Sequence, residues 1–523
     1  MKQYDAIVIG GGINSLAAAA LLAQDEKSIL LLESRDTLGG MASSYEFTPG
    51  FRCNMIYDYI PWIDPRLIKR LCLEEHGFKL ATPDPLRVAL DENDKHIIFH
   101  TDPEKTAASI ASHCAADGQK WSEFTEYIRK LTSFLEPLYN MTPPVISQLG
   151  LPEALRMSTM LRPLWKHGSR GLVDTIRTVP MMMPELLDEW FETKLLRGSL
   201  AASGIHHITQ GPYSAATSLN FLHQHIHVDG HIHDAHYING GTDKFANALY
   251  KVANNNGADI RTGTSVSSIN CKNGICFGVS TSSNGKTYNS DMVISGLDPA
   301  HTFIKLVGSS KISPTFQRQL KNIKYRGSTA RIHFALKKRP EIKNIEYDMH
   351  NTIFEVNPSI EYLERASDDA KYGRISKNPY IEFNIPTLRV PGYAARGMHV
   401  LSATIQYVPY HLRSGNWNDK LKNQLIQNVT YILEKYIPDF SDIIEKTVIM
   451  TPADFETSLG LSEGNLNHGE MTLDQFFFMR PTISTAQYKT PIHNLYLCGP
   501  GTHPGGGLHG ANAVNAYLNI IKT

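Results

Sequence analysis

The sequence has few cysteines and no excess of charge of either sign. Its 523 residues include six cysteines and no Cys-x-x-Cys pair, a composition that favours a reduced, cytoplasmic protein over a disulfide-bonded one. Cys271 and Cys276 flank a turn and could still face each other. Lysine and arginine together number 51, as do aspartate and glutamate, so the basic footprint of a nucleic-acid-binding protein is absent and we expect no nucleic-acid partner.

Long apolar runs are also missing. No run approaches the roughly 20 residues that cross a bilayer, and no signal-peptide pattern precedes Tyr4. We therefore expect a soluble protein. The amphipathic stretch 127–135 leaves peripheral membrane contact open, although such stretches usually face a core. The length suits about two or three globular domains.

The most informative segment that is present spans residues 4–15. An apolar strand, 6–9, leads into Gly10-x-Gly12, and the alanine-rich helix 16–23 follows at once. A strand, a tight glycine turn and a helix place a pyrophosphate at the N-terminus of the helix. Ser15 stands where the third glycine of this motif is expected.

The next strand, 28–32, ends in an acid. Glu33 lies 23 residues after Gly10, where a carboxylate can hold both hydroxyls of an adenosine ribose and argues against a 2′-phosphate. The sequence therefore predicts a dinucleotide site, with Gly10, Gly12, Asn14, Ser15, Glu33 and Ser34 as its contacts.

Two further glycine-rich loops identify the dinucleotide. Gly39-Gly40 allows close approach of the main chain to a bulky ligand, and Arg35 and Ser43 can reach phosphate or ribityl oxygens. Near the C-terminus, a strand at 494–498 opens into the glycine-rich turn 499–510 before a terminal helix. The free N–H groups there can stabilise negative charge on a reduced isoalloxazine. FAD accounts for both ends of the chain, whereas NAD accounts only for the first.

These segments resemble the phytoene desaturase-like family of FAD oxidoreductases and, within it, the group described as pyridine nucleotide-disulfide oxidoreductase domain-containing protein 2. The resemblance implies an amine oxidase/phytoene desaturase-like α/β fold: a discontinuous Rossmann-type FAD-binding domain with β-hairpin elements, and an α+β substrate domain. The matching segments are the Gly10 loop, 35–43, 47–51, 238–241, 295–299, 451–454, 468–475, 480–481, 488–491 and 498–516.

The pattern divides the chain into alternating segments of two domains. Residues 1–90, 236–300 and 455–523 are assigned to the FAD-binding domain, and 91–235 and 301–454 to the substrate domain. For the FAD-binding domain we expect a helix at 244–254, strands at 260–269, 275–281 and 292–295, and hairpin turns at Asn273-Gly274 and Asn284-Gly285. For the substrate domain we expect helices at 103–115, 120–135 (closed by Pro137) and 420–436, and strands at 330–336 and 399–406.

The loops and the resemblance together predict the cofactor contacts. Val266 is implied to offer backbone hydrogen bonds to the adenine, as its counterpart does in the family. The predicted contacts are Gly10, Gly12, Asn14, Ser15, Glu33, Ser34, Arg35, Gly39, Gly40, Ser43, Val266, Gly499, Gly507, Leu508 and His509.

Three side chains are candidates for the chemistry. His503 and His509 flank the glycines beside the presumed flavin ring, where an imidazole could assist proton or hydride transfer, although His503 could instead fix its own loop. Arg480 could anchor a carboxylate or a flavin carbonyl, or form a structural ion pair with Asp474.

A run of histidines, His223, His225, His227, His231, His233 and His236, is the oddest composition in the chain. At the period of a strand, the first three share one face. They could bind zinc or iron, line the substrate cavity or be structural, and no metal site is predicted because one alternating run seldom closes a tetrahedral site. The apolar runs 181–183 and 476–479 could line a tunnel for a lipid-like substrate or belong to the core.

The combined prediction is an FAD-dependent oxidoreductase that desaturates an apolar, lipid- or isoprenoid-like small molecule by hydride transfer to flavin N5. No second Gly-x-Gly-x-x-Gly loop follows a strand, so we expect oxygen or a quinone as the electron acceptor. The alternatives are a redox-neutral isomerase or saturase, an amine oxidase, and an escort or GDP-dissociation-inhibitor-like binding protein. Residues 55–59 fall where the family varies with its substrate, so the substrate stays open, as does the oligomeric state.

Overall fold

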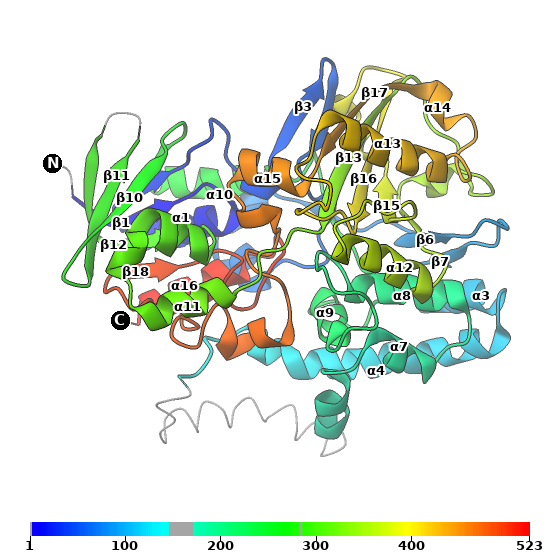
Figure 1. Ribbon diagram of the computed structural model, residues 1–523, viewed down its shortest axis with the longest axis horizontal. Helices are drawn as coiled ribbons and strands as arrows, with labels where there is room; N and C mark the ends of the chain where they lie inside the picture. The colour runs from blue at the N-terminus through cyan, green and yellow to red at the C-terminus, as the bar shows by residue number, and fades with distance from the viewer. Residues whose placement is uncertain (1–2, 146–170, 283–284, 523) are drawn as a thin grey trace.

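The protein consists of two lobes that lie side by side, each built around one sheet (Figure 1). The computed structural model describes residues 3–145, 171–282 and 285–522. Both ends of the chain lie in the same lobe (Figure 1). Within these described ranges, no helix is long and apolar enough to cross a membrane.

The sheet of the first lobe combines strands from three distant segments of the chain. Its strand order is β10-β11-β12-β1-β2-β9, with β18 paired to β12. β1 runs parallel to β2 and β12, whereas β10, β11 and β12 form antiparallel pairs. The strands are β1 (Gln3–Ile9), β2 (Ile29–Leu32), β9 (Asp259–Arg261), β10 (Val266–Lys272), β11 (Ile275–Thr281), β12 (Thr287–Ser295) and β18 (Leu495–Leu497). The predicted discontinuous Rossmann-type fold with β-hairpin elements is confirmed.

The central strand β1 faces a different core on each side. Ala6 and Val8 lie in one core, whereas Ile7 and Ile9 lie in the other. Apolar residues at every position are typical of a parallel strand that is covered on both faces. The first core is covered by α1 (Ile13–Gln24), α10 (Asp243–Asn255) and α16 (Ala511–Ile520), and the second by η4 (His301–Gly308) and α11 (Pro314–Asn322). Alanine-rich α1 packs against both α10 and α16.

The sheet of the second lobe has the order β17-β13-β16-β15-β14-β6-β7. Its strands are β6 (Arg87–Leu90), β7 (Ile97–Phe99), β13 (Thr329–Leu336), β14 (Ile353–Val356), β15 (Tyr380–Asn384), β16 (His399–Gln406) and β17 (Ile444–Met450). One face packs against α13 (Asp419–Leu433), and helices α4 (Ala115–Tyr139), α8 (Lys194–Gly204) and α12 (Ile360–Lys371) lie on the other side (Figure 1). Because β6 belongs to this sheet, residues 1–90 contribute only β1 and β2 to the first sheet.

The side chains on the two faces of this second sheet differ in polarity. Ile381 and Phe383 of β15 lie in the apolar core below α13, whereas Glu382 between them faces the other way. The same alternation places Arg87 of β6 and Arg331 of β13 on the polar face. Every one of these side chains is buried, so the polar face is covered by protein and borders a cavity.

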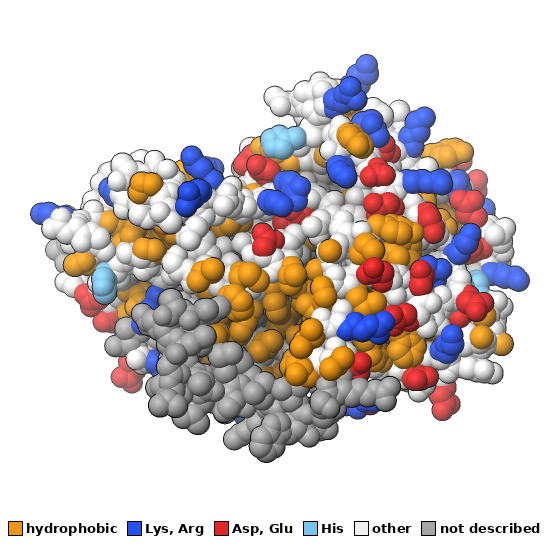
Figure 2. Space-filling view, turned by 60° about the horizontal axis from the view of Figure 1, so that its bottom comes forward, with side chains coloured by type: hydrophobic (Ala, Val, Ile, Leu, Met, Phe, Trp, Pro, Cys, Tyr) orange, Lys and Arg blue, Asp and Glu red, His pale blue; other side chains and the backbone are white. Residues whose placement is uncertain are grey.

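The remaining helices and hairpins surround these two sheets. They are α2 (Pro65–Arg70), α3 (Pro103–Ala111), α4 (Ala115–Tyr139), α7 (Met183–Asp188), α8 (Lys194–Gly204), α9 (Thr217–Gln224), α12 (Ile360–Lys371), α14 (Phe440–Ile443), α15 (Pro452–Leu459), β3 (Ser44–Thr48), β4 (Phe51–Asn54), β5 (Leu80–Ala81) and β8 (Tyr237–Ile238). On the face of the second lobe in Figure 2, side chains of both charge signs are intermixed around a group of apolar ones.

The helix predicted at 120–135 is longer than expected. α4 runs on through Pro137 to Tyr139. A proline this close to the end of a helix removes a single N–H from its hydrogen bonding, and the buried Leu135 and Tyr139 hold the last turn in the core. The apolar side chains of 127–135 face this core. Of the two predicted hairpin turns, Asn273-Gly274 joins β10 to β11, whereas Asn284 lies outside the described residues.

Candidate active site

The N-terminal glycine loop borders a cavity of about 660 Å³ in the first lobe. Gly10 turns the chain with φ of +95° at the end of β1. Gly12 precedes α1 with φ of −73° and ψ of 171°, a conformation open to any residue, and a Cβ there would meet no heavy atom within 4 Å. Glycine at position 12 therefore keeps space empty, whereas Gly10 supplies a left-handed turn.

Glu33 connects this loop to the second glycine loop. Its Oε2 accepts a hydrogen bond from the Gly11 N–H (2.5 Å), and its Oε1 accepts from the Arg35 N–H (2.8 Å) and from the Ser34 hydroxyl (3.2 Å). The Arg35 guanidinium donates to Ser43 Oγ at 3.4 Å. Burial lowers the pKa of Arg35, with the Glu33 charge acting in the opposite sense.

The structure brings ten of the fifteen predicted cofactor residues to this one cavity: Gly10, Gly12, Asn14, Ser15, Glu33, Arg35, Gly39, Gly40, Gly507 and Leu508. The other five lie behind or beside it. Ser34 and Ser43 hydrogen-bond to the lining residues. Gly499 packs against Gly296, the residue after β12, where a Cβ on Gly499 would lie 2.4 Å from the Gly296 carbonyl oxygen. Val266 begins β10 and His509 lines a second cavity, so the contacts predicted for these five stay predictions.

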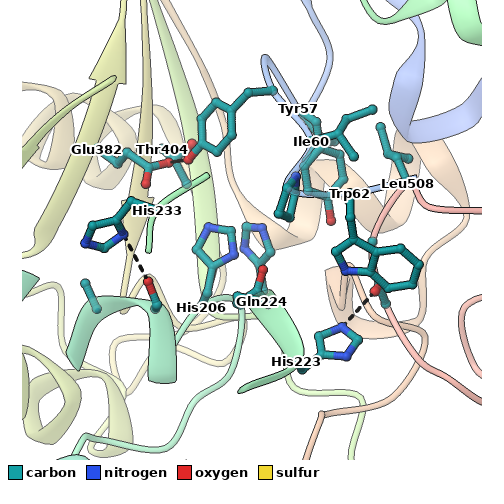
Figure 3. A pocket seen from close by; sticks show the side chains of 18 of the residues that line it. Tyr57, Ile60, Trp62, His206, His223, Gln224, His233, Glu382, Thr404 and Leu508 are labelled. Carbon is teal, nitrogen blue, oxygen red and sulfur yellow. Dashed lines mark hydrogen bonds between the residues drawn. The ribbon is translucent and has the colours of Figure 1, made fainter. Parts of the chain in front are cut away.

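The second cavity adjoins the first at Gly507 and Leu508, which line both. It contains about 1020 Å³ of space outside protein atoms, part of it open to solvent. Near Leu508 the wall is largely apolar and aromatic, with Ile60 and Trp62 beside it (Figure 3). Residues 55–59, predicted to lie at a substrate-dependent position, contribute Ile56 through Tyr59 to this wall.

His509 lines the second cavity but already uses both ring nitrogens. Its ring stacks on Trp62 with centroids 4.2 Å apart. The Ala511 N–H donates to Nδ1 (3.1 Å), so Nε2 carries the proton and donates to the Gly506 carbonyl (3.0 Å). Burial holds the pKa of His509 well below its usual range. The ring is therefore neutral and orients the glycine loop and Trp62, which leaves it poorly suited to exchange protons.

His503 lines neither cavity. It is fully buried, its Nε2 donates to the Leu138 carbonyl (2.7 Å), and its ring packs edge-on against Tyr139 and Phe477. Burial lowers its pKa to about 3. These contacts fit the loop-fixing alternative for His503.

Arg480 holds the C-terminal glycine loop from behind and also lines neither cavity. Its guanidinium donates to the carbonyls of Asn467 (2.5 Å), Gly469 (3.1 Å), Gln475 (3.4 Å), Pro500 (2.9 Å) and Thr502 (3.3 Å). The suggested ion pair with Asp474 is wrong, because that carboxylate accepts from the Thr472 hydroxyl instead. Burial lowers the pKa of Arg480 to about 10. Arg480 therefore positions the loop.

The histidine run does not form the strand on which its period-two spacing relied. His223 lies in the last turn of α9, whose apolar residues Leu219 and Leu222 follow helical spacing, and residues 225–235 form turns and loops. Only His223, His225 and His233 of the run reach the wall of the second cavity. Over the described ranges, no three His, Cys, Asp or Glu side chains are arranged to hold a metal ion.

The runs 181–183 and 476–479 belong to the core and do not line the second cavity. Met183 and Phe477 are buried, and Phe476 packs against Tyr139. The expectation of a tunnel wall at these runs is not supported. Met471, which the sequence did not single out, lines the cavity instead.

The far end of the second cavity carries three buried ion pairs, formed by two arginines, that sequence reasoning missed. Arg87 Nη1 lies 2.6 Å from Glu382 and 3.0 Å from Glu355, and the Tyr59 hydroxyl donates to Glu382. Arg331 lies 2.5 Å from Asp58. Burial opposes the ionisation of Glu382, but the charge of Arg87, the nearby His206 and the hydrogen bonds from Tyr59 and Arg87 together lower the pKa of this carboxyl. The sequence signal for these residues is the alternation of polar and apolar residues in β15. This pattern is also typical of a strand with one face in solvent, so it does not by itself indicate a buried site.

Comparison with known proteins places the chain in a family. A family model described as flavin-containing amine oxidoreductase matches residues 16–513. This chain belongs to that family. Pyridine nucleotide-disulfide oxidoreductase domain-containing protein 2 of Rattus norvegicus is 30% identical over 99% of this chain and 94% of its own length. The resemblance drawn from the motifs is confirmed, as is the assignment as an FAD-dependent oxidoreductase.

More distant relatives include two proteins named for dehydrogenating enzymes. A limonene dehydrogenase polypeptide of Castellaniella defragrans is 24% identical over 100% of this chain and 95% of its own length. Phytoene desaturase (lycopene-forming) of a Paracoccus species is 22% identical over 97% and 94%. An oxidoreductase structure from Methanosarcina mazei shares the fold with a TM-score of 0.60 at 15% identity, covering 99% of this chain and all of that one.

The residues of this flavin-containing amine oxidoreductase fit its cofactor FAD. A Cβ at Gly12 would occupy the open space beside the loop. No side chain in the described part of the molecule caps α1, so its first N–H groups are available to a pyrophosphate. The buried Oδ1 of Asn14 has no hydrogen-bond partner among the described residues and lies on the cavity wall. Empty space, free donors and a free acceptor therefore meet at the first cavity.

Proposed function

We propose that this protein is a dehydrogenase that forms a carbon–carbon double bond in a substrate with a hydrocarbon portion. The observation that carries the proposal is the apolar and aromatic wall where the two cavities meet. Leu508, Ile60 and Trp62 lie at this end (Figure 3), so the carbon that reaches the flavin cavity contacts hydrocarbon side chains. When bound, FAD supplies the acceptor for a hydride. The names of the limonene dehydrogenase and phytoene desaturase relatives support the same reaction class.

The residues of the chain would act by holding the substrate and excluding water. His509 and Trp62 form a stacked pair against one side of the cavity. Arg480 fixes the loop that joins the two cavities through its hydrogen bonds to five backbone carbonyls. Rigid walls keep a reacting C–H bond in one orientation. The substrate would lose a hydride from one carbon and a proton from its neighbour, and the electron pair left behind would form the double bond.

Oxidation of an amine is the second candidate, because carboxylates lie on the cavity wall. However, Glu382 is paired with Arg87 and Asp58 with Arg331. A cationic amine would have to compete with a guanidinium for either carboxylate. This pairing favours the carbon–carbon reaction over the amine reaction.

The test is anaerobic mixing of the purified, yellow protein with three sets of compounds. The sets are cyclic monoterpene hydrocarbons, a total lipid extract and a panel of primary and secondary amines. We expect the oxidised-flavin absorbance to bleach with a member of the first two sets, and mass spectrometry to find a product with two fewer hydrogens.

Other outcomes favour the alternatives. Bleaching by amines alone would replace the proposal with amine oxidation, and an isomeric product without bleaching would indicate a redox-neutral isomerase. Admitting air or a quinone to the bleached enzyme then tests the proposed electron acceptors, because the effective one restores the absorbance.

A further inference from the structure

Six histidines line the second cavity, and one of them differs from the rest. Three are His207, bonded to Thr329 (3.0 Å), His225, bonded to the Phe221 carbonyl (2.7 Å), and His233, bonded to Ser199 (3.1 Å). His223 and His509 both bond the Gly506 carbonyl. The ring of His206 has no hydrogen bond or ion pair to any described residue, and it points into the middle of the cavity, between Glu382 and Trp62 (Figure 3).

The turn that carries His206 is held by a buried glutamine. Gln406 of β16 donates from Nε2 to the carbonyls of Ile205 and Ile208, the latter at 2.8 Å, and accepts from the His207 N–H at 2.9 Å. The Ser328 hydroxyl also donates to the Ile208 carbonyl (3.0 Å). Four hydrogen bonds, three with Gln406 at the end of β16 and one from Ser328 just before β13, thus fix the four-residue turn 205–208.

This turn also contains a strained residue. His207 has a φ of +60°, which is uncommon for a residue with a Cβ. Such conformations persist where the surroundings over-determine them, and they cluster at functional sites. The His206 and His207 rings lie with centroids 3.8 Å apart. The strained conformation of His207 and the four hydrogen bonds to the turn together hold the unpartnered His206 ring toward the cavity.

The electrostatic surroundings of His206 include one anion that is not on its own turn. Glu382 of β15 and Arg87 of β6 affect the pKa of His206, and His206 in turn affects the pKa values of His207 and His223. Burial and the Arg87 charge lower the pKa of His206, and the Glu382 carboxylate acts in the opposite sense. The ring is therefore neutral in the resting protein, and Glu382, although paired with Arg87, favours its protonated form.

We propose that His206 accepts the proton that leaves the substrate carbon, with Glu382 stabilising the imidazolium that results. The inference rests on the proposed function, in which hydride leaves the adjacent carbon to the FAD. The C–H electron pair released to the substrate forms the double bond, the proton moves to a ring nitrogen of His206, and solvent water takes it up, because part of the cavity is open to solvent. The backbone turn holds the base, and the nearby carboxylate favours its protonated form, as acid–base catalysis requires.

The first test compares two histidine variants of the FAD-loaded protein. His206→Gln keeps a side chain of similar size without a titratable ring, and His231→Gln changes an exposed histidine outside this cavity. With a compound that bleaches the wild type, we expect His206→Gln to slow flavin reduction by about 10²- to 10⁴-fold at unchanged FAD content. The wild-type rate should rise with pH as His206 loses its proton, and this dependence should vanish in His206→Gln only. Equal rates and pH profiles in the two variants would overturn the proposal.

The second test needs no substrate. In protein with ¹³Cε1-labelled histidine, the signal that His206→Gln removes reports the titration of His206. We expect Glu382→Gln to shift this titration downward by about half to one pH unit, whereas Glu361→Gln on α12 should leave it unchanged. A His206 signal that does not respond to Glu382→Gln would refute the stabilising pair.

The two tests separate the two proposals. Should no compound bleach the wild type, the proposed dehydrogenation fails, while the titration still decides whether His206 and Glu382 are coupled. If Glu382→Gln does not fold, the rate and the pH profile of His206→Gln decide whether His206 accepts the proton. Bleaching by a substrate combined with an unaffected His206→Gln would leave the dehydrogenase standing and refute the role of His206.

Discussion

The two cavities of this flavoprotein are built in opposite ways. In the first, the glycines at positions 10, 12, 39 and 40 and the N-terminus of α1 bring backbone to the wall, beside side chains such as Glu33 and Arg35. The second is bordered by side chains from both lobes, including the buried ion pairs of Arg87 and Arg331. A backbone-built site suits a cofactor whose shape is fixed, whereas a side-chain-built site can change its chemistry without changing the fold.

Gly12→Ala should give the largest effect on the backbone-built cavity. The added methyl group meets no protein atom within 4 Å, so the fold accommodates it, but it enters the space that the pyrophosphate needs. We expect FAD affinity to fall at least about tenfold, or about 1.4 kcal/mol, as measured by flavin absorbance per protein and by titration with added FAD. Glu33→Ala should also lose FAD, because Glu33 holds the loop at the Gly11 N–H.

Gly392→Ala is the matched control for the glycine variant. A Cβ at Gly392 also has no heavy atom within 4 Å, and this residue lies outside both cavities. Full flavin content in both alanine variants would contradict the assignment of the Gly10 loop.

Arg480→Met tests how far the two cavities depend on one shared loop. The substitution removes the donor from five backbone carbonyls in a buried site. We expect a loss of about 3 kcal/mol or more in the free energy of unfolding, since each buried group left unpaired costs about 1–3 kcal/mol. Thermal unfolding measures the loss. The stability of Arg480→Lys should lie between those of the wild type and Arg480→Met, because lysine keeps the charge without the planar guanidinium. Unchanged stability in Arg480→Met would refute the positioning role.

Acid should destabilise the folded protein through its buried histidines. Burial lowers the pKa of His223 to about 4 and that of His503 to about 3, whereas both titrate near 6.5 when unfolded. The unfolded chain therefore binds more protons below pH 6.5, and each histidine removes up to about 1.4 kcal/mol per pH unit as the pH falls towards its folded value. Melting temperatures at pH 7.5 and 5.0 measure this loss. The fall in melting temperature between pH 7.5 and 5.0 should be smaller in His503→Asn than in the wild type, and unchanged in His231→Asn. An equal fall in both variants would contradict this explanation.

Ser15→Gly should have the smallest effect. Ser15 occupies the third glycine position of the loop, and its hydroxyl donates weakly to the Ile9 carbonyl (3.4 Å). Glycine there would lower stability by about 0.5 kcal/mol through helix propensity and leave FAD content unchanged. Loss of FAD in this variant would mean that the serine contacts the cofactor directly.

The contrast between the cavities explains what the sequence could predict. The first cavity consists of local motifs, so the spacing from Gly10 to Glu33 and the pair Gly39-Gly40 identify it directly. The second gathers single residues from many elements, and nothing local marks His206 or Arg87 as neighbours. β15 alternates polar and apolar residues like a solvent-facing strand, yet all five are buried. Periodicity reports which side chains share a face, but not what covers that face.

The three-segment origin of the first sheet has a consequence for biosynthesis. α1 is synthesised long before α16, one of the two helices that cover it. β18, which pairs with β12 in the same sheet, is also synthesised long after α1. The alanine-rich helix must therefore stay partly uncovered until α16 has been synthesised. Loss of α16 should expose this apolar face and make the chain a client of chaperones.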